Sequence, residues 1–411
     1  MTEKTNIPQG YKDSPLGIIP EEWEVKRLEE LCTKIGSGVT PRGGQNVYLS
    51  QGRPFLRSQN VANGYLLLDD VVFIDEITHQ KQKSTEIELD DVLLNITGAS
   101  IGRSAVATSE IVGGNVNQHV CIIRLKDKTL SYYICAFLLS YIGQKQIDSY
   151  QAGGNREGLN YDQIASFKIF IPSSKEIIQI WNFLSLWDTA IEKQSELIEK
   201  LKLRKRALMQ QLLTGKKRLP GFSEEWKEVK LGDIFDERNE INRDDLPLLS
   251  ITGDKGVIYQ SESDKRDISN DDKSKYKRIC PNDIGYNTMR MWQGRSALSE
   301  LEGIVSPAYT IVTPRENVNV RFMAMLIQQP RVVYDFWTHS QGLVSDTLNC
   351  KYPDFCQVKV RIPSKEGQTA IADMLYDFDK EINLANEKLS NLQSQKRGLM
   401  QQLLTGKKRI K

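Results

Sequence analysis

The sequence predicts an α+β fold in which two β-rich modules are separated by two long helices packed as an antiparallel coiled coil. Three observations lead to this prediction: one segment occurs twice almost unchanged, an apolar heptad pattern leads into each copy, and short strand-like runs fill the rest. A chain of 411 residues is also too long for one ordinary hydrophobic core. We therefore expect a pseudo-two-fold internal repeat.

The duplicated segment is the strongest signal in the chain. It runs over Lys205–Arg218 and again over Lys396–Arg409, with thirteen of fourteen positions identical. Upstream, Glu21–Trp23 recurs as Glu224–Trp226. Because both matches keep the same order along the chain, the sequence predicts the arrangement module, helix, module, helix.

The predicted boundaries follow from this repeat. The first module spans 1–160, the first long helix 161–219, the second module 220–353 and the second long helix 354–411. Runs such as Val120–Leu125 and Tyr309–Val312 are rich in β-branched and aromatic residues, and Gly-rich links separate them, which predicts strands joined by surface loops.

The two predicted helices carry a heptad seam. With Ile177 as position a, nine of the eleven a and d positions are apolar in each copy. A sustained heptad of this kind indicates a coiled coil, and a helix of about 39 residues is about 60 Å long. Gly215 and Gly406 suit the left-handed C-cap that ends a helix. The predicted seam residues are Leu184, Ile191, Ile198, Leu201 and Leu208, and in the second helix Leu375, Ile382, Leu389, Leu392 and Leu399.

An apolar seam needs a partner, and two near-identical seams in one chain can cover each other. The module between them requires a long return path, which favours an antiparallel pair with the modules at its opposite ends. The alternative is that each seam pairs with another chain.

Composition narrows the class of protein. The chain has 55 Lys and Arg against 53 Asp and Glu, which excludes a uniformly basic nucleic-acid coat but allows a local basic face. Six cysteines without a Cys-x-x-Cys pair indicate reduced thiols and a cytoplasmic location. Only three histidines occur, far apart, which argues against a His-built metal site. The longest apolar stretch, 130–142, is too short to cross a bilayer, so no membrane partner is expected.

Motifs for catalysis are missing from the sequence. Gly98–Ser104 resembles a P-loop, but it is one residue short between the glycines and has Arg where Lys is required. No Gly-x-Gly-x-x-Gly follows a predicted strand. The sequence therefore predicts a protein that is not an enzyme and that binds no cofactor itself.

Polar, glycine-bearing loops favour nucleic-acid binding instead. Arg pairs with guanine, Asn and Gln pair with adenine, and backbone amides bind phosphate. For each loop residue the alternative is an ordinary solvated turn, and for Trp292 and Tyr309 it is a place in the core. The predicted DNA-binding residues are Thr40, Arg42, Arg57, Gln59, Asn60, Ser100, Arg103, Asn117, Gln118 and Arg156, and in the second module Lys255, Arg290, Trp292, Gln293, Arg295 and Tyr309.

Together these features resemble one family over essentially the whole chain. Glu-Glu-Trp opens each module, and Leu-Met-Gln-Gln-Leu-Leu-Thr-Gly-Lys-Lys-Arg closes each helix. This pattern is similar to the specificity (S) subunit of Type I restriction-modification systems. The resemblance implies a non-catalytic DNA reader with two target-recognition domains, each reading half of a bipartite site, and helices that set the spacing.

The resemblance also implies partners. Two methylation (M) subunits would dock on the helices, and restriction (R) subunits would join them in a complete restriction system. S-adenosylmethionine, ATP and Mg would be bound by those partner subunits. Two other readings stay open: a coiled-coil adaptor with two protein- or glycan-binding modules, and a two-domain reader that serves a fused nuclease-methylase.

Overall fold

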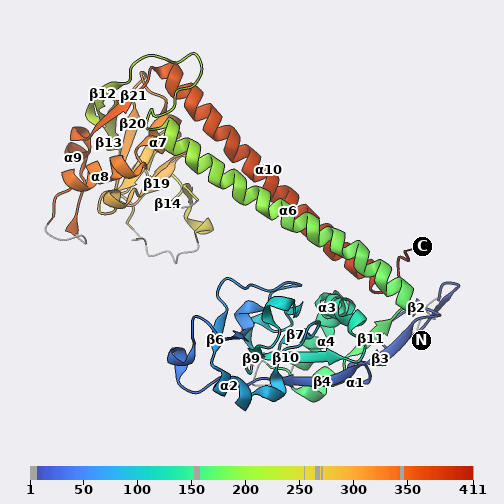
Figure 1. The fold of residues 1–411 in the computed structure, drawn as a ribbon. Helices are drawn as coiled ribbons and strands as arrows, with labels where there is room; N and C mark the ends of the chain where they lie inside the picture. Colours follow the sequence, from blue (N-terminus) through green and yellow to red (C-terminus); the bar gives the residue numbers. More distant parts are fainter. Residues whose placement is uncertain are drawn as a thin grey trace. The chain divides into compact units, whose positions relative to one another are not determined.

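The computed structural model describes residues 7–151, 158–253, 255–263, 269, 272–342 and 347–410. The chain forms two compact units, and each holds one β-rich module together with parts of both long helices (Figure 1). Unit 1 comprises Met1–Gln194 with Lys388–Lys411, and unit 2 comprises Ser195–Glu387. The predicted α+β fold with two long helices is confirmed.

The module of unit 1 is built on a four-stranded antiparallel sheet of order β4-β10-β7-β8. Its two central strands are almost entirely buried, because helices and loops cover both faces. The sheet strands are β4 (Cys32–Ser37), β10 (Val120–Leu125), β7 (Val92–Asn95) and β8 (Ser104–Val106). The other elements are β1 (Tyr11–Lys12), β2 (Ile19–Pro20), β3 (Glu24–Arg27), β5 (Arg53–Leu56), β6 (Val72–Ile74), β9 (Asn115–Val116), β11 (Lys168–Ile171), α1 (Leu28–Leu31), α2 (Glu76–Lys81), α3 (Ser131–Leu139), α4 (Tyr141–Gln151) and α5 (Tyr161–Ala165).

The module of unit 2 repeats this sheet. Its order, β13-β20-β17-β18, matches the first sheet strand for strand, and all its neighbours are antiparallel. The predicted internal repeat is therefore confirmed at the level of topology. The sheet strands are β13 (Phe235–Arg238), β20 (Tyr309–Pro314), β17 (Ile284–Asn287) and β18 (Ser296–Leu298). The other elements are β12 (Lys227–Lys230), β14 (Leu249–Ile251), β15 (Val257–Tyr259), β16 (Lys277–Ile279), β19 (Gly303–Val305), β21 (Lys359–Ile362), α7 (Val320–Leu326), α8 (Pro330–His339) and α9 (Tyr352–Gln357).

The long helices α6 (Ser174–Leu212) and α10 (Lys365–Leu403) have 39 residues each and run antiparallel where they meet in each unit. In unit 1, Lys396 near the end of α10 pairs with Asp188 in the first half of α6. In unit 2 the roles are exchanged: Lys205 of α6 pairs with Asp379 of α10, with 2.5 Å between Nζ and Oδ1. Both lysines occupy a positions of the seam. A charged residue at such a position fixes the register of a helix pair when a partner satisfies it.

The predicted seam residues face the partner helix or the modules. All ten are buried or half-buried, and Leu184, Ile198, Leu201 and Leu375 are at most 6% exposed. On the opposite face of α6, Leu186 is 67% exposed. The heptad pattern thus separates a buried stripe from a solvated one.

The end of the chain completes the core of unit 1. Leu403 and Leu404 belong to the same buried cluster as Trp23. The buried carboxylate of Glu176 accepts hydrogen bonds from the indole N–H of Trp23 (3.0 Å) and from Nε and Nη2 of Arg409 (2.5 and 2.9 Å). The last residues therefore hold the start of α6 against the first module.

Arg409→Ala is expected to lower the free energy of unfolding of unit 1 by about 2 kcal/mol, because the buried Glu176 loses its charged partner. The value lies below that of a fully buried pair because Arg409 keeps 34% of its side-chain surface exposed. Urea unfolding measures it. Arg218→Ala is the matched control, since the repeat-equivalent Arg218 donates to the carbonyl of Glu224. An equal effect of both variants would contradict the assignment.

Other features bear on the predicted class of protein. No helix among the described residues is long and apolar enough to cross a membrane. Within the same residues, no three or more His, Cys, Asp or Glu side chains are grouped to hold a metal ion. The six cysteines are unpaired, and burial raises the pKa of both Cys32 and Cys121 to about 12.

Candidate nucleic-acid interface

The loops that carry the predicted contact residues meet at one end of the sheet in unit 1. The register places Ser37 at the end of β4 opposite Cys121, and Asn95 at the end of β7 opposite Val120. Leu94 likewise lies opposite Ser104. Because neighbouring strands are antiparallel, the loops after β4 and β7 and the turn before β10 share this end of the sheet. Thr40, Arg42, Ser100, Arg103, Asn117 and Gln118 belong to them.

Asn95 ties a further loop to the same end. Its backbone N–H donates to the carbonyl of Arg103 (2.8 Å), and its side-chain amide donates to the carbonyl of Ser58 (2.8 Å). The segment that contains Arg57, Gln59 and Asn60 is therefore fixed beside the β7–β8 loop.

These three side chains all bind Asp70. The guanidinium of Arg57 donates to the Asp70 carbonyl (2.9 Å), the amide of Asn60 donates to Oδ1 (2.6 Å), and the amide of Gln59 donates to Oδ2. Asn60 is fully buried, so it has no surface for a base. Arg57 is half-buried and Gln59 is exposed. In this structure the three residues shape the loop, and Gln59 is the one of the three that is exposed.

The remaining candidates of unit 1 differ in exposure. Arg42, Arg103 and Gln118 are exposed, whereas Thr40 and Ser100 are half-buried. Asn117 is 6% exposed, and its side-chain oxygen accepts from the backbone N–H of His119 (3.0 Å), which shapes the turn before β10. Arg156 lies outside the described residues. Contact with DNA stays a prediction for all of them.

In unit 2 the β17–β18 loop, the start of β20 and the β14–β15 hairpin line a polar cavity of about 600 Å³. Five of the six residues predicted for this module line it together. The sixth, Trp292, is absent from the described lining, and its indole N–H donates to the carbonyl of Met289 (3.0 Å). The described lining residues are Ile251, Thr252, Gly253, Lys255, Ile258, Ser263, Asn287, Arg290, Gln293, Arg295 and Tyr309.

Two details show how the cavity is built. The Tyr309 hydroxyl donates to the carbonyl of Ile251 (3.3 Å), and burial raises the pKa of Tyr309, so the phenol stays neutral. Gly253 faces Arg295: a Cβ on Gly253 would lie 2.0 Å from Nη1. Because Gly253 has no side chain, the Arg295 guanidinium can occupy the space beside it.

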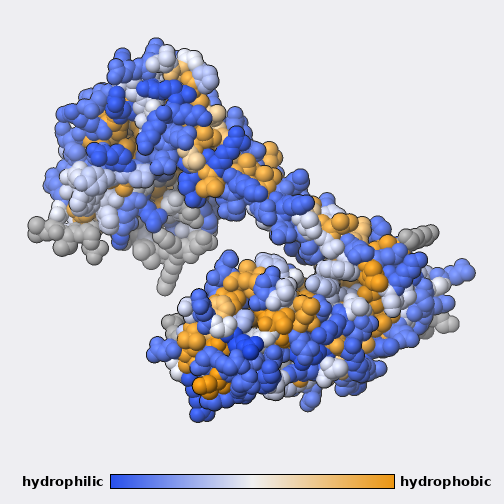
Figure 2. Space-filling model, viewed as in Figure 1, coloured by the Kyte–Doolittle hydropathy of each residue, from blue (hydrophilic) through white to orange (hydrophobic). Residues whose placement is uncertain are grey.

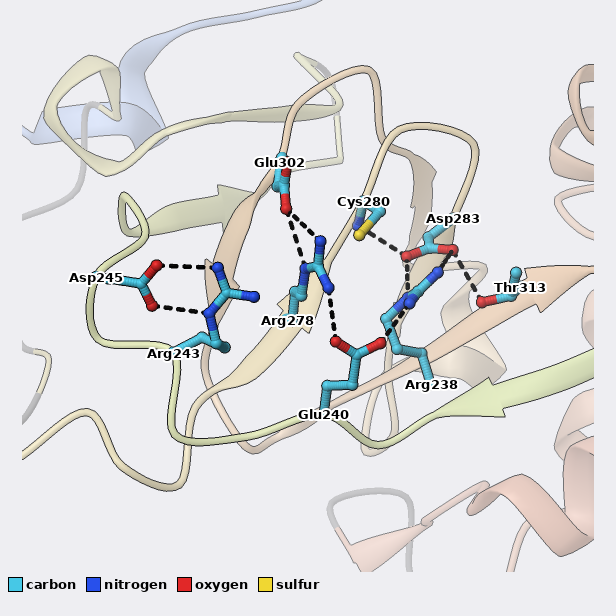
Figure 3. Close-up of polar contacts among 9 residues, drawn as sticks. All are labelled: Arg238, Glu240, Arg243, Asp245, Arg278, Cys280, Asp283, Glu302 and Thr313. Carbon is cyan, nitrogen blue, oxygen red and sulfur yellow. Dashed lines mark hydrogen bonds and ion pairs between the residues drawn. The ribbon is translucent and has the colours of Figure 1, made fainter.

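Five arginines of the second module fall into two groups. Arg238, Arg243 and Arg278 are bound by carboxylates, as Figure 3 shows. The side chains of Arg290 and Arg295, in contrast, make no hydrogen bond or ion pair with any of the described residues. Their charge is therefore available at the cavity.

Arg238 and Arg278 of the first group belong to one connected network, whereas Arg243 pairs separately with Asp245. Arg238 binds the buried Asp283 through Nε and Oδ2 (2.7 Å), and Asp283 also accepts from Thr313 (2.9 Å). Glu240 then bridges Arg238 and Arg278. These contacts join β13, β16 and β20 to the residue directly before β17, so the network supports the sheet rather than adding free positive charge.

Sequence reasoning missed the supporting residues. Asp70 and Gly253 carry no sequence signal, because their roles depend on side chains that approach from distant loops. Asn95 had a signal: Asn95 and Asn287 are each followed, eight residues later, by the Arg of a Gly-Arg-Ser run.

Comparison with known proteins agrees with this architecture. The family model for the Type I restriction modification DNA specificity domain matches twice, over residues 20–203 and 223–394. The Type I restriction enzyme MjaVIII specificity subunit of Methanocaldococcus jannaschii is 21% identical over 96% of this chain and 94% of its own length.

Two solved structures share the fold. The HsdS subunit from Thermoanaerobacter tengcongensis has a TM-score of 0.52 at 14% identity, and covers 96% of this chain and 99% of that one. The S subunit of a Type-I restriction-modification system from M. genitalium has a TM-score of 0.51 at 13% identity, with 98% of each chain covered. With two copies of the specificity domain spanning most of its length, this chain belongs to the Type I restriction-modification DNA specificity family.

Proposed function

We propose that this chain is the DNA-reading specificity subunit of a Type I restriction-modification complex, and that each module reads one half of a bipartite site. One observation carries the proposal. Two modules with the same sheet order gather Arg, Asn and Gln side chains at the same end of the sheet, on loops of different sequence. A shared scaffold with different loops suits two readers of different half-sites.

The long helices are proposed to set the spacing and to dock two methylation subunits. Hydrophobic patches lie along the long helices in Figure 2. The exposed apolar side chains of the two helices include Leu186, Leu203 and Leu384, at 67%, 63% and 65%. Exposed leucines of this kind suit a protein partner. The near-identical ends of α6 and α10 would offer the same surface to two copies of that partner. Half-sites on one face of the duplex would be centred roughly 10 bp apart.

In this proposal the chemistry lies with the partners. The methylation subunits would bring S-adenosylmethionine, restriction subunits would bring ATP and Mg when the system is complete, and this chain would supply recognition alone. The rival is a coiled-coil adaptor with protein- or glycan-binding modules. The free arginines at the cavity of unit 2 favour the DNA reader, because a guanidinium without a carboxylate partner suits phosphate and base edges.

The test is the pattern of methylated adenines in a host that expresses a methylation subunit with and without this chain. The expected result is a two-part motif with a fixed gap that appears only when the chain is present. Retention of the complex on DNA should fall steeply with salt, by a slope of about −0.9 per neutralised phosphate. A complex that forms but neither methylates nor binds DNA would favour the adaptor.

A further inference from the structure

The two modules share a hairpin of the same length at the proposed reading end. It joins β7 to β8 in unit 1 and β17 to β18 in unit 2, and in both it closes with Gly-Arg-Ser. The glycines are left-handed in both cases, with φ of 85° at Gly102 and 72° at Gly294. Glycine adopts such a φ without strain, so both hairpins can place this backbone conformation directly before the arginine.

One backbone hydrogen bond places the two arginines at the same position on the scaffold. The backbone N–H of Asn95 donates to the Arg103 carbonyl (2.8 Å), and that of Asn287 donates to the Arg295 carbonyl (3.0 Å). Each arginine is followed by a buried serine that starts the next strand. The six residues between Asn and Gly have no identity between the hairpins. The arginine is thus held in register while its surroundings differ.

Both side chains are available to a ligand. Arg103 and Arg295 are exposed, and neither guanidinium has a hydrogen bond or ion pair with any residue that the structure describes. Arg295 projects over Gly253 into the cavity, whose described lining holds Arg, Lys, Asn and Gln but no carboxylate. A lining of this kind favours a ligand that offers acceptors.

We propose that Arg103 and Arg295 are equivalent base-reading residues, each of which recognises a guanine in its own half-site through the O6 and N7 acceptors of the major groove. The inference rests on the proposed function and adds the base, the residue and the equivalence of the two positions. The guanidinium fork matches these two acceptors bidentately. The backbone of each arginine is hydrogen-bonded to the neighbouring strand, which fixes its position. Such an arginine suits contact with a base edge, because recognition of a base requires one defined position.

The experiment uses the full chain in complex with its methylation subunit, after the methylated motif has been determined. Arg295→Ala is expected to weaken binding of the complex to its DNA site by about 5- to 150-fold. It should also relax the requirement for guanine at one position of one half-site. Arg103→Ala is expected to do the same in the other half-site only. Each variant is the matched control for the other, since both remove the same side chain from the same scaffold position.

A modified base separates base contact from phosphate contact. Replacing the assigned guanine by 7-deazaguanine removes N7, and should weaken the wild-type complex but not weaken the Arg295→Ala complex further. If Arg295→Ala instead weakens binding equally on every DNA sequence and makes the salt dependence of binding shallower, the proposal is overturned in favour of a phosphate contact. A wild-type complex that binds no DNA at all would instead refute the proposed function.

A second variant tests the placement without removing the arginine. Gly253→Ala puts a methyl group where the Arg295 guanidinium lies, and that flexible side chain can move at little cost in stability. Recognition of the same guanine is expected to weaken while the unfolding curve stays unchanged. Unaltered recognition in the Gly253→Ala variant would contradict the placement of Arg295 at that base.

Discussion

Arg238→Met is expected to lower the free energy of unfolding of unit 2 by about 3–5 kcal/mol. The guanidinium binds both carboxylate oxygens of Asp283, at 2.7 and 3.2 Å, and Asp283 is 1% exposed. Methionine fills much of the same space but leaves a buried carboxylate without its counter-charge. Urea unfolding followed by tryptophan fluorescence measures the change, because Trp226 and Trp292 belong to this unit.

Two further variants isolate the cause. Arg243→Met removes an arginine whose partner Asp245 keeps 61% of its side-chain surface exposed, so no measurable change is expected. Combining Arg238→Met with Asp283→Asn removes both charges, and should recover part of the loss. If Arg238→Met and Arg243→Met behave alike, the buried pair does not stabilise the sheet.

Leu184→Asp is expected to prevent stable folding of unit 1. Leu184 lies in the seam, is 2% exposed and belongs to the buried cluster that joins α6 to the first module and to the end of α10. An aspartate there has no partner, and burying an unpaired charge costs more than removing an apolar side chain. We expect a loss on the order of 4–5 kcal/mol, seen as insoluble expression or as a lost urea transition.

The control stands two residues away on the same helix. Leu186 is 67% exposed, so Leu186→Asp changes the same residue type to the same charge without burying it. Its unfolding curve should match the wild type. A similar loss in both variants would show that the effect comes from helix propensity and not from the seam.

The sequence allowed the scaffold to be predicted closely. The heptad that starts at Ile177 lies within α6 (Ser174–Leu212), which is shorter than the 161–219 predicted for the first long helix. The run Val120–Leu125 coincides with β10, and Tyr309–Val312 lies within β20. Local periodicity sufficed here because each of these segments buries one continuous apolar face. The amphipathic helix α8 escaped notice, since its apolar residues are mixed with exposed Tyr334 and Trp337.

The candidate site was less accessible to sequence reasoning. The sequence predicted loops rich in Arg and Asn as the site, but the partners of these side chains lie far along the chain. Arg57 appeared as free as Arg103, yet Arg57 is bound by Asp70. The buried aspartates directly before β7 and β17 show the same limit of sequence reasoning. Asp91 in unit 1 pairs with Arg124 of β10, whereas Asp283 in unit 2 pairs with Arg238 of β13. The same position takes its counter-charge from a different strand, which no local pattern reveals.

The closure of unit 1 by Lys388–Lys411 has a consequence for the order of assembly during synthesis. At ~5–20 residues per second, the ribosome needs roughly 10–40 s to translate the intervening Ser195–Glu387 before the closing segment emerges. Unit 2 is continuous and can fold as soon as its own residues are out. The module that is synthesised first is thus the last to be completed. Until Arg409 emerges, Glu176 lacks the guanidinium that it binds beside Trp23. Nascent chains that stop before the last turn of α10 should therefore carry a finished second module and an open first one.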